Sequence, residues 1–195
     1  MISIVIADDH GIVREGLRRL LEAEPDLRVC GEAADGREVL RQIASSKPDV
    51  VVLDITMPKL GGLETLDQIR SEHKQTKVVL LSVHSDPPFI QSAVSLGADG
   101  YVLKNGPASE IVTAIREVMN GGSYFSPAVT KEIVQQLRAP KSESEDPFSL
   151  LSGREREVLH RIADGLPAKE VAVEPSIRKK TREAHRASTT AARQG

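Results

Sequence analysis

Short apolar runs alternate along residues 1–121 with segments in which apolar residues recur every three or four positions. The runs are rich in β-branched residues and are Ile2–Ala7, Leu27–Gly31, Val50–Leu53, Val78–Ser82 and Gly100–Leu103. Because they are continuously apolar rather than alternating, we expect parallel strands that are buried on both faces.

The segments between these runs have the periodicity of amphipathic helices. Their apolar stripes are Val13/Leu17/Leu20/Leu21, Val39/Leu40/Ile43, Leu63/Leu66/Ile69, Ile90/Ala93/Val94 and Ile111/Ile115/Val118. Asp35 and Glu38 have the spacing of a capping box at the start of the second helix. Strict alternation of strand and helix predicts an α/β fold, a doubly wound parallel sheet of five strands in the flavodoxin-like order.

The pattern changes after residue 121. It predicts a connecting helix from about Pro127 to Leu137 and a polar linker at residues 139–148. Ser152 and Glu155 have the spacing of a second capping box, so we expect a small all-α region that begins there. The expected parts are a domain over 1–121, a connecting helix and linker over 122–151, and a helical region over 152–195.

Charge is unevenly distributed between these parts. Residues 152–195 carry 10 Lys and Arg against 6 Asp and Glu, a net of +4, whereas residues 1–151 carry 16 against 22, a net of −6. A basic C-terminal part suits a nucleic-acid partner, but a solvated basic helix explains the charge equally well. The single cysteine, Cys30, excludes an intramolecular disulfide and fits a reducing, cytoplasmic setting. Residues 1–4 lack the features of a signal peptide, and no apolar run has membrane-spanning length, so we expect no membrane partner.

Polar residues with complementary chemistry follow four of the predicted strands: Asp8, Asp9, Asp54, Ser82 and Lys104. The carboxyl ends of parallel strands meet at one edge of a doubly wound sheet, so these side chains are expected to converge there. Three neighbouring carboxylates repel one another unless a cation is present, and Mg²⁺ is the cation that an all-oxygen site favours. With a lysine and a hydroxyl, the set predicts phosphoryl transfer to an aspartate. A lone Asp at a strand end is usually a cap or turn former, but the combination argues against that interpretation.

These residues carry a resemblance to a known family. The Asp8-Asp9 pair, Asp54 followed by Ile55-Thr56-Met57-Pro58, the Gly61-Gly62-Leu63 turn, Ser82, and Tyr101 three residues before Lys104 resemble the receiver domain of two-component response regulators of the NarL/FixJ type.

The resemblance implies a role for each matching residue. Asp54 would be the phospho-acceptor for a sensor histidine kinase, with Ser82 and Lys104 contacting the phosphoryl group. Asp8, Asp9, Asp54 and the backbone carbonyl of Thr56 would bind Mg²⁺. Ser82 and Tyr101 would form the switch that couples phosphorylation to output. His10 and His84 are interpreted as residues at the rim of the site.

Residues 152–195 resemble a LuxR-type helix-turn-helix. The match includes Ser152 to Leu159 for the first helix and residues around Lys169 to Ala172 for the scaffold helix. By this resemblance the recognition helix would lie in the major groove, with Lys180, Thr181, His185 and Arg186 as the DNA contacts. The resemblance also implies a homodimer formed on phosphorylation.

The match to the helix-turn-helix is incomplete. At four positions where the family is apolar, this chain has Ile177, Arg182, Thr189 and Arg193. An unpaired guanidinium in a core costs several kcal/mol, and the match stops before the family's fourth helix. Two function classes therefore stay open: a phosphorylation-controlled transcription factor, or a receiver with a degenerate effector that acts through protein contacts or as a phosphate sink. A stand-alone enzyme is disfavoured, because the site would consume its own carboxylate.

Overall fold

The structure is a computed structural model, and it describes residues 1–138. Strands and helices alternate as β1 (Ile2–Ala7), α1 (Gly11–Glu22), β2 (Leu27–Ala33), α2 (Gly36–Ser46), β3 (Val50–Asp54), α3 (Gly62–Glu72), β4 (Lys77–Ser82), α4 (Pro87–Ser95), β5 (Gly100–Leu103), α5 (Ser109–Met119), β6 (Tyr124–Phe125) and α6 (Pro127–Arg138). The strands are parallel, in the order β2-β1-β3-β4-β5-β6. The predicted doubly wound fold is confirmed.

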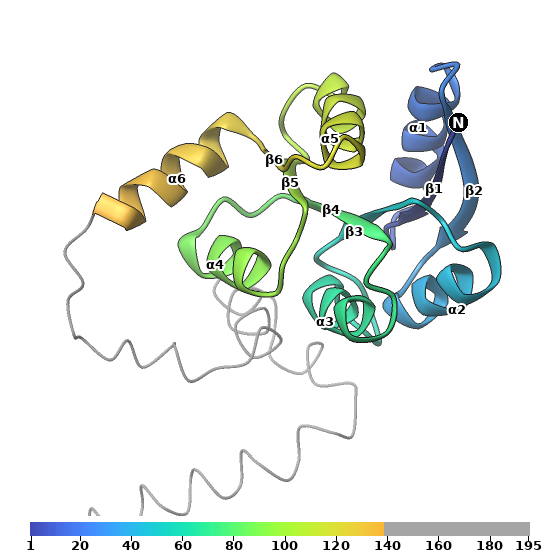
Figure 1. The fold of residues 1–195 in the computed structure, drawn as a ribbon, viewed down its shortest axis with the longest axis horizontal. Helices are drawn as coiled ribbons and strands as arrows, with labels where there is room; N and C mark the ends of the chain where they lie inside the picture. The colour runs from blue at the N-terminus through green and yellow to red at the C-terminus, as the bar shows by residue number, and fades with distance from the viewer. Residues whose placement is uncertain (139–195) are drawn as a thin grey trace, which may run out of the picture. The chain divides into compact units, whose positions relative to one another are not determined.

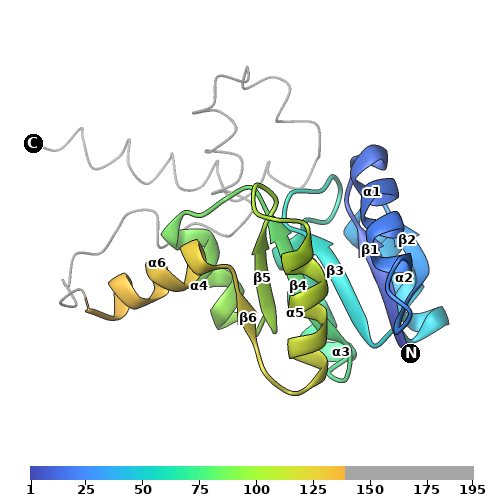
Figure 2. The same ribbon diagram turned by 90° about the horizontal axis from the view of Figure 1, so that it is seen from above.

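Helices cover both faces of this sheet (Figures 1 and 2). Alternate residues of each strand point to opposite faces, so that Val5 packs in the layer beneath α2, α3 and α4, whereas Ile4 and Ile6 pack beneath α1 and α5. Both layers are largely aliphatic and buried, and each buried Val, Leu or Ile side chain contributes roughly 1.5–3 kcal/mol by its removal from water. Burial on both faces explains why the strands read as continuous apolar runs.

The sheet has six strands rather than the predicted five. The two residues of β6 pair with Gly100 and Tyr101 of β5 and cover an edge that would otherwise be open. A strand of two residues that follows the Gly121-Gly122 turn is too short to produce an apolar run, so periodicity alone could not reveal it. The sheet therefore continues past residue 121, into the segment that we expected to begin the connection.

The predicted connecting helix is present as α6. Val129 on its first turn is fully buried in the layer that contains α4, and Gln136 accepts a hydrogen bond from Gln91 of α4 at 3.0 Å. Ser126, just before α6, donates its backbone N–H to the carbonyl of Tyr101 at 2.9 Å, and its hydroxyl accepts from the N–H of Leu103 at 3.2 Å. That hydroxyl also donates to Glu110 of α5. The start of α6 is therefore tied to the end of β5.

Candidate functional site

The carboxyl ends of four neighbouring strands bring the predicted site residues together. Asp8 and Asp9 follow β1, Asp54 is the last residue of β3, Ser82 is the last residue of β4, and Lys104 follows β5. Strand order reverses between β1 and β3, and ligands of open α/β sheets bind at such a switch point. The convergence that the sequence predicted is present.

Lys104 bridges the two buried carboxylates of the site. Its Nζ donates a hydrogen bond to Oδ2 of Asp54 at 2.8 Å and lies 2.7 Å from Oδ2 of Asp8. Asp8 and Asp54 are buried, at 0% and 2% exposure, whereas Asp9 is exposed. One ammonium group thus faces two carboxylates inside the protein.

This arrangement perturbs the pKa values of the site. Burial raises the pKa of Asp54 to about 6, and the hydrogen bond from Lys104 opposes that rise without cancelling it. Burial alone would lower the pKa of Lys104, but its contacts with Asp54 and Asp8 outweigh burial and raise the pKa above the ordinary lysine value. Lys104 therefore stays charged near neutral pH, whereas Asp54 titrates just below it.

Candidate ligand atoms for a cation, carboxylate oxygens and one imidazole nitrogen, gather at the same place. Asp8, Asp9, His10 and Asp54 each offer one ligand atom, and these atoms lie within 4.8 Å of one another. Oδ2 of Asp8 is buried and, despite the nearby ammonium, accepts no hydrogen bond of good geometry within the described residues. Three carboxylates against one lysine leave an excess of negative charge, which a divalent cation with oxygen ligands would neutralise. The residues present therefore fit Mg²⁺.

His10 lies at the edge of the acidic cluster. Its Nδ1 lies 2.6 Å from Oδ1 of Asp9 and 3.3 Å from Oδ1 of Asp8, and its side chain is 66% exposed. This exposure agrees with the position at the rim of the site that the sequence predicts for His10. His10 directly follows Asp8 and Asp9 in the sequence, and this adjacency is the feature from which the contact could be predicted.

Local backbone geometry positions Asp54 and the residues after it. The N–H of Thr56 donates to Oδ1 of Asp54 at 3.2 Å, and the N–H of Gly62 donates to the carbonyl of Ile55 at 2.8 Å. A Cβ at Gly62 would lie 2.1 Å from the backbone oxygen of Asp54, so only glycine allows α3 to start this close to β3. The glycine in the turn is thus a requirement for closing the loop that follows Asp54.

Ser82 and Tyr101 are linked through the backbone of His84. The Ser82 hydroxyl accepts from the N–H of His84 at 2.9 Å, and the Tyr101 hydroxyl donates to the carbonyl of His84 at 2.8 Å. Tyr101 is fully buried, and burial raises its pKa to about 12. The His84 ring stacks on Phe89 in the first turn of α4 with centroids 4.3 Å apart. The pair expected to form the switch thus shares one loop residue.

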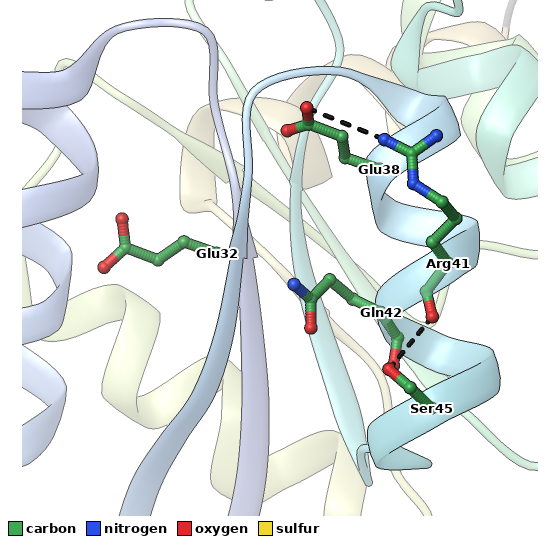
Figure 3. A pocket seen from close by; sticks show the side chains of 5 residues that line it. All are labelled: Glu32, Glu38, Arg41, Gln42 and Ser45. Atoms are coloured by element: carbon green, nitrogen blue, oxygen red, sulfur yellow. Dashed lines mark hydrogen bonds and ion pairs between the residues drawn. The ribbon is translucent and has the colours of Figure 1, made fainter.

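A separate hollow of about 270 Å³ lies beside β2 and α2 (Figure 3). It is lined by Glu32, Glu38, Arg41, Gln42 and Ser45. These groups already have partners: Glu32 pairs with Arg18 at 2.6 Å, and Glu38 accepts from the N–H of Ala34 at 2.9 Å. Figure 3 shows Glu32 extending away from the α2 side chains, so the polar groups do not converge on one ligand. The acidic site at the strand ends is the better candidate.

The predicted DNA contacts Lys180, Thr181, His185 and Arg186 lie outside the described residues, as do the four positions of the expected apolar stripe. Among the helices that the structure describes, none is both long and apolar enough to span a bilayer.

Two protein families match this chain. The response regulator receiver domain matches residues 4–116, and the family described as bacterial regulatory proteins, luxR family, matches residues 149–191. The receiver match alone covers more than half of the chain.

Whole proteins are similar to it over most of their length. The oxygen regulatory protein NreC of Staphylococcus carnosus is 36% identical over 189 residues, which cover 94% of this chain and 87% of NreC. The nitrate/nitrite response regulator protein NarL of Escherichia coli K12 is 34% identical over 183 residues, 94% of this chain and 85% of NarL. A crystal structure of a LuxR-family two-component response regulator from Aurantimonas sp. SI85-9A1 superposes with a TM-score of 0.68 at 37% identity, over 70% of this chain and 98% of that one. This chain therefore belongs to the two-component response regulators that join a receiver domain to a LuxR-type helix-turn-helix and regulate transcription.

Proposed function

We propose that this response regulator is switched by phosphoryl transfer from a histidine kinase to Asp54. The observation that carries the proposal is the Lys104 ammonium held between two buried carboxylates at the strand switch point. A carboxylate nucleophile, an oxygen-rich cation site and a fixed positive charge are the parts that such a transfer needs.

In this proposal Asp8, Asp9, Asp54 and the backbone carbonyl of Thr56 hold Mg²⁺. The bound ion would neutralise charge on the phosphoryl oxygens and orient them. The chain's own residues supply the other two roles. Asp54 is the nucleophile, and Lys104 and Ser82 are hydrogen-bond donors for the phosphoryl oxygens.

The chemistry is a displacement at phosphorus. A carboxylate oxygen of Asp54 attacks the phosphohistidine, the P–N bond breaks, and the imidazole leaves with the electron pair and takes up a proton. The product is an aspartyl phosphate. The Lys104 ammonium, which pairs with the two carboxylates before the reaction, would then also pair with a phosphoryl oxygen.

Phosphorylation adds roughly −1.5 to −2 charge and three acceptor oxygens. Ser82 can donate to these oxygens only in the phosphorylated protein, and such differential contacts bias a two-state domain towards its active form. In this proposal Ser82 and Tyr101 pass the change on, a homodimer forms, and Lys180, Thr181, His185 and Arg186 contact DNA through paired half-sites.

Labelling with radioactive acetyl phosphate in the presence of Mg²⁺ tests the input. Asp54→Asn should abolish labelling, and Asp67→Asn on the exposed face of α3 should label as the natural chain does. Full labelling of Asp54→Asn would refute the assignment of the phospho-acceptor.

Gel-shift titration with the protein's own promoter region tests the output, with and without acetyl phosphate. Binding at physiological salt that Lys180→Ala and Arg186→Ala remove, and that Lys74→Ala on the exposed surface of the receiver keeps, supports the DNA contacts. Weak, sequence-blind binding that disappears with added salt would instead favour the receiver with a degenerate effector.

A further inference from the structure

The loop between Asp54 and α3 contains a residue with an unfavourable backbone conformation. Lys59 has a φ of +65°, in the left-handed region, and Lys47 is the other non-glycine residue with positive φ in residues 1–138. Lys47 ends α2, where this conformation is common. Lys59 is not at a helix end, and a left-handed lysine costs roughly 1–2 kcal/mol, so surrounding contacts must hold it.

An ion pair with α2 holds the side chain of Lys59. Its Nζ donates to Oδ2 of Asp35 at 2.6 Å, across 24 residues of sequence. Asp35 is 2% exposed and is itself fixed, because its Oδ1 accepts from the N–H of Glu38 at 2.9 Å as the N-cap of α2. The lysine of the loop is therefore attached to a rigid, buried anchor.

The backbone of the loop lies against the same helix end. The N–H of Gly36 donates to the carbonyl of Leu60 at 3.1 Å. A Cβ at Gly36 would lie 1.9 Å from Oγ1 of Thr65 and 2.7 Å from that carbonyl oxygen, so glycine is needed for the approach. Two independent contacts thus bind the middle of the loop to the start of α2.

The ends of the loop are fixed by other contacts. Thr56 donates its N–H to the Asp54 carboxylate at 3.2 Å, and Oγ1 of Thr65 donates to the carbonyl of Gly61 at 2.7 Å. Without the ion pair, the loop would keep the hydrogen bond from Gly36 to Leu60 but lose the contact that offsets the left-handed conformation of Lys59. The segment that would then change is the one that carries the Thr56 carbonyl.

We propose that the Asp35–Lys59 ion pair positions the loop that presents the Thr56 carbonyl to the metal, so that both residues set the affinity of the site without touching it. The inference rests on the proposed function, in which Asp8, Asp9, Asp54 and Thr56 bind Mg²⁺. Lys59 and Asp35 are positioning residues, and the conformational cost at Lys59 is what the ion pair offsets.

Three variants separate positioning from simple stabilisation. Lys59→Met keeps the aliphatic stem and removes the charge. Asp35→Asn keeps a good N-cap and removes the partner charge. Lys59→Gly removes the ion pair and also the conformational cost of positive φ, because glycine adopts this conformation without steric strain. Lys74→Met, at an exposed position, is the matched control.

The measurement is binding of Mn²⁺, as a probe for Mg²⁺, to the unphosphorylated full chain, followed by the EPR signal of free Mn²⁺. Lys59→Met and Asp35→Asn should each weaken binding about tenfold, the lower end of the effect of outer partners on metal affinity. Lys59→Gly should weaken it less, because glycine has no conformational cost at positive φ for the ion pair to offset. The double variant Asp35→Asn with Lys59→Met should be no weaker than either single variant, because both remove the same contact. Lys74→Met should bind as the natural chain does.

Thermal unfolding in EDTA supplies the second readout. A lower unfolding temperature of Lys59→Met with unchanged Mn²⁺ affinity would show a purely structural pair and overturn the inference. Weaker binding by Lys59→Gly than by Lys59→Met would also overturn it, because the ion pair would then not act by offsetting the conformational cost at Lys59. Asp9→Asn tests the metal site itself: if the natural chain binds no Mn²⁺, or Asp9→Asn binds it equally well, the proposed metal site fails and this inference fails with it.

Discussion

The ammonium group of Lys104 lies 2.7 Å from a carboxylate oxygen of Asp8 and 2.8 Å from one of Asp54, and both carboxylates are buried. Removal of this charge would leave two carboxylates facing each other in a low-dielectric site. Lys104→Met should therefore destabilise the metal-free protein by roughly 3 kcal/mol, towards the value for breaking a buried ion pair. Saturating Mg²⁺ should recover most of this loss.

Urea unfolding in EDTA measures the loss of unfolding free energy, and urea unfolding in Mg²⁺ measures how much of it is recovered. Lys74→Met is the control for loss of a surface lysine. Equal destabilisation in EDTA and in Mg²⁺ would show that the cation does not bind beside these carboxylates.

Asp54 should titrate near neutral pH. Burial raises its pKa from 3.8 to about 6 in the folded protein, so the folded state keeps a proton that the unfolded chain releases. In a carbon NMR titration of the aspartate carboxyl groups without divalent cations, one midpoint near this value should disappear in Asp54→Asn. Added Mg²⁺ should lower that midpoint, because a cation favours the ionised carboxylate. A midpoint that Mg²⁺ leaves in place would argue against coordination by Asp54.

The same shift predicts a pH-dependent stability. Because the folded-state pKa is raised, the stabilising contribution of protonated Asp54 is complete below the unfolded-state pKa near 4 and is lost as pH rises through about 6. Without divalent cations, Asp54→Asn should therefore be more stable than the natural chain at pH 7.5, by up to about 3 kcal/mol at 1.36 kcal/mol per pKa unit. At pH 4 the two proteins should unfold at nearly the same urea concentration. A constant difference across this range would contradict the assignment.

Gly62 should tolerate no side chain. A Cβ there would lie 2.1 Å from the backbone oxygen of Asp54, so Gly62→Ala must displace either β3 or α3, at a cost of about 3 kcal/mol. Gly16→Ala is the matched comparison, because Gly16 is exposed within α1 and a Cβ there meets no atom within 4 Å. That change should stabilise the protein by about 0.5–1 kcal/mol. Chemical denaturation should show a lower free energy of unfolding for Gly62→Ala and a higher one for Gly16→Ala. Labelling with acetyl phosphate should fall in Gly62→Ala alone.

Tyr101→Phe should loosen the loop that joins Ser82 to α4. The change removes the hydrogen bond that the Tyr101 hydroxyl donates to the carbonyl of His84, at a cost of about 1 kcal/mol. Amide hydrogen exchange should accelerate at residues 83–86 and stay unchanged in α2. The rate at which acetyl phosphate labels Asp54 should remain within about twofold of the rate in the natural chain, because the Tyr101 hydroxyl contacts neither that carboxylate nor Lys104. Unchanged exchange at these residues would remove Tyr101 from the proposed switch.

Much of this architecture could be predicted from the sequence because the responsible physics is local. Five buried strands produce continuous apolar runs, and Asp35 and Glu38 have the capping spacing that the structure contains. Asp8, Asp9, Asp54, Ser82 and Lys104 could be placed together because parallel strands end at a common edge. The remaining features depend on contacts between distant residues. The positive φ of Lys59 and its pairing with Asp35 leave no mark in a periodic pattern, and the two residues of β6 are too few to form one.

The attachment of Ser126 to Leu103 and Glu110 determines where the first domain can be cut. A fragment that ends at residue 121 would lack β6, so the hydrogen-bonding groups of β5 would face solvent as an open strand edge, a known template for self-association. It would also lack Val129, and the space beneath α4 would be left unfilled. The smallest autonomous receiver that we expect from this chain therefore runs to Arg138, and the shorter fragment should aggregate on concentration.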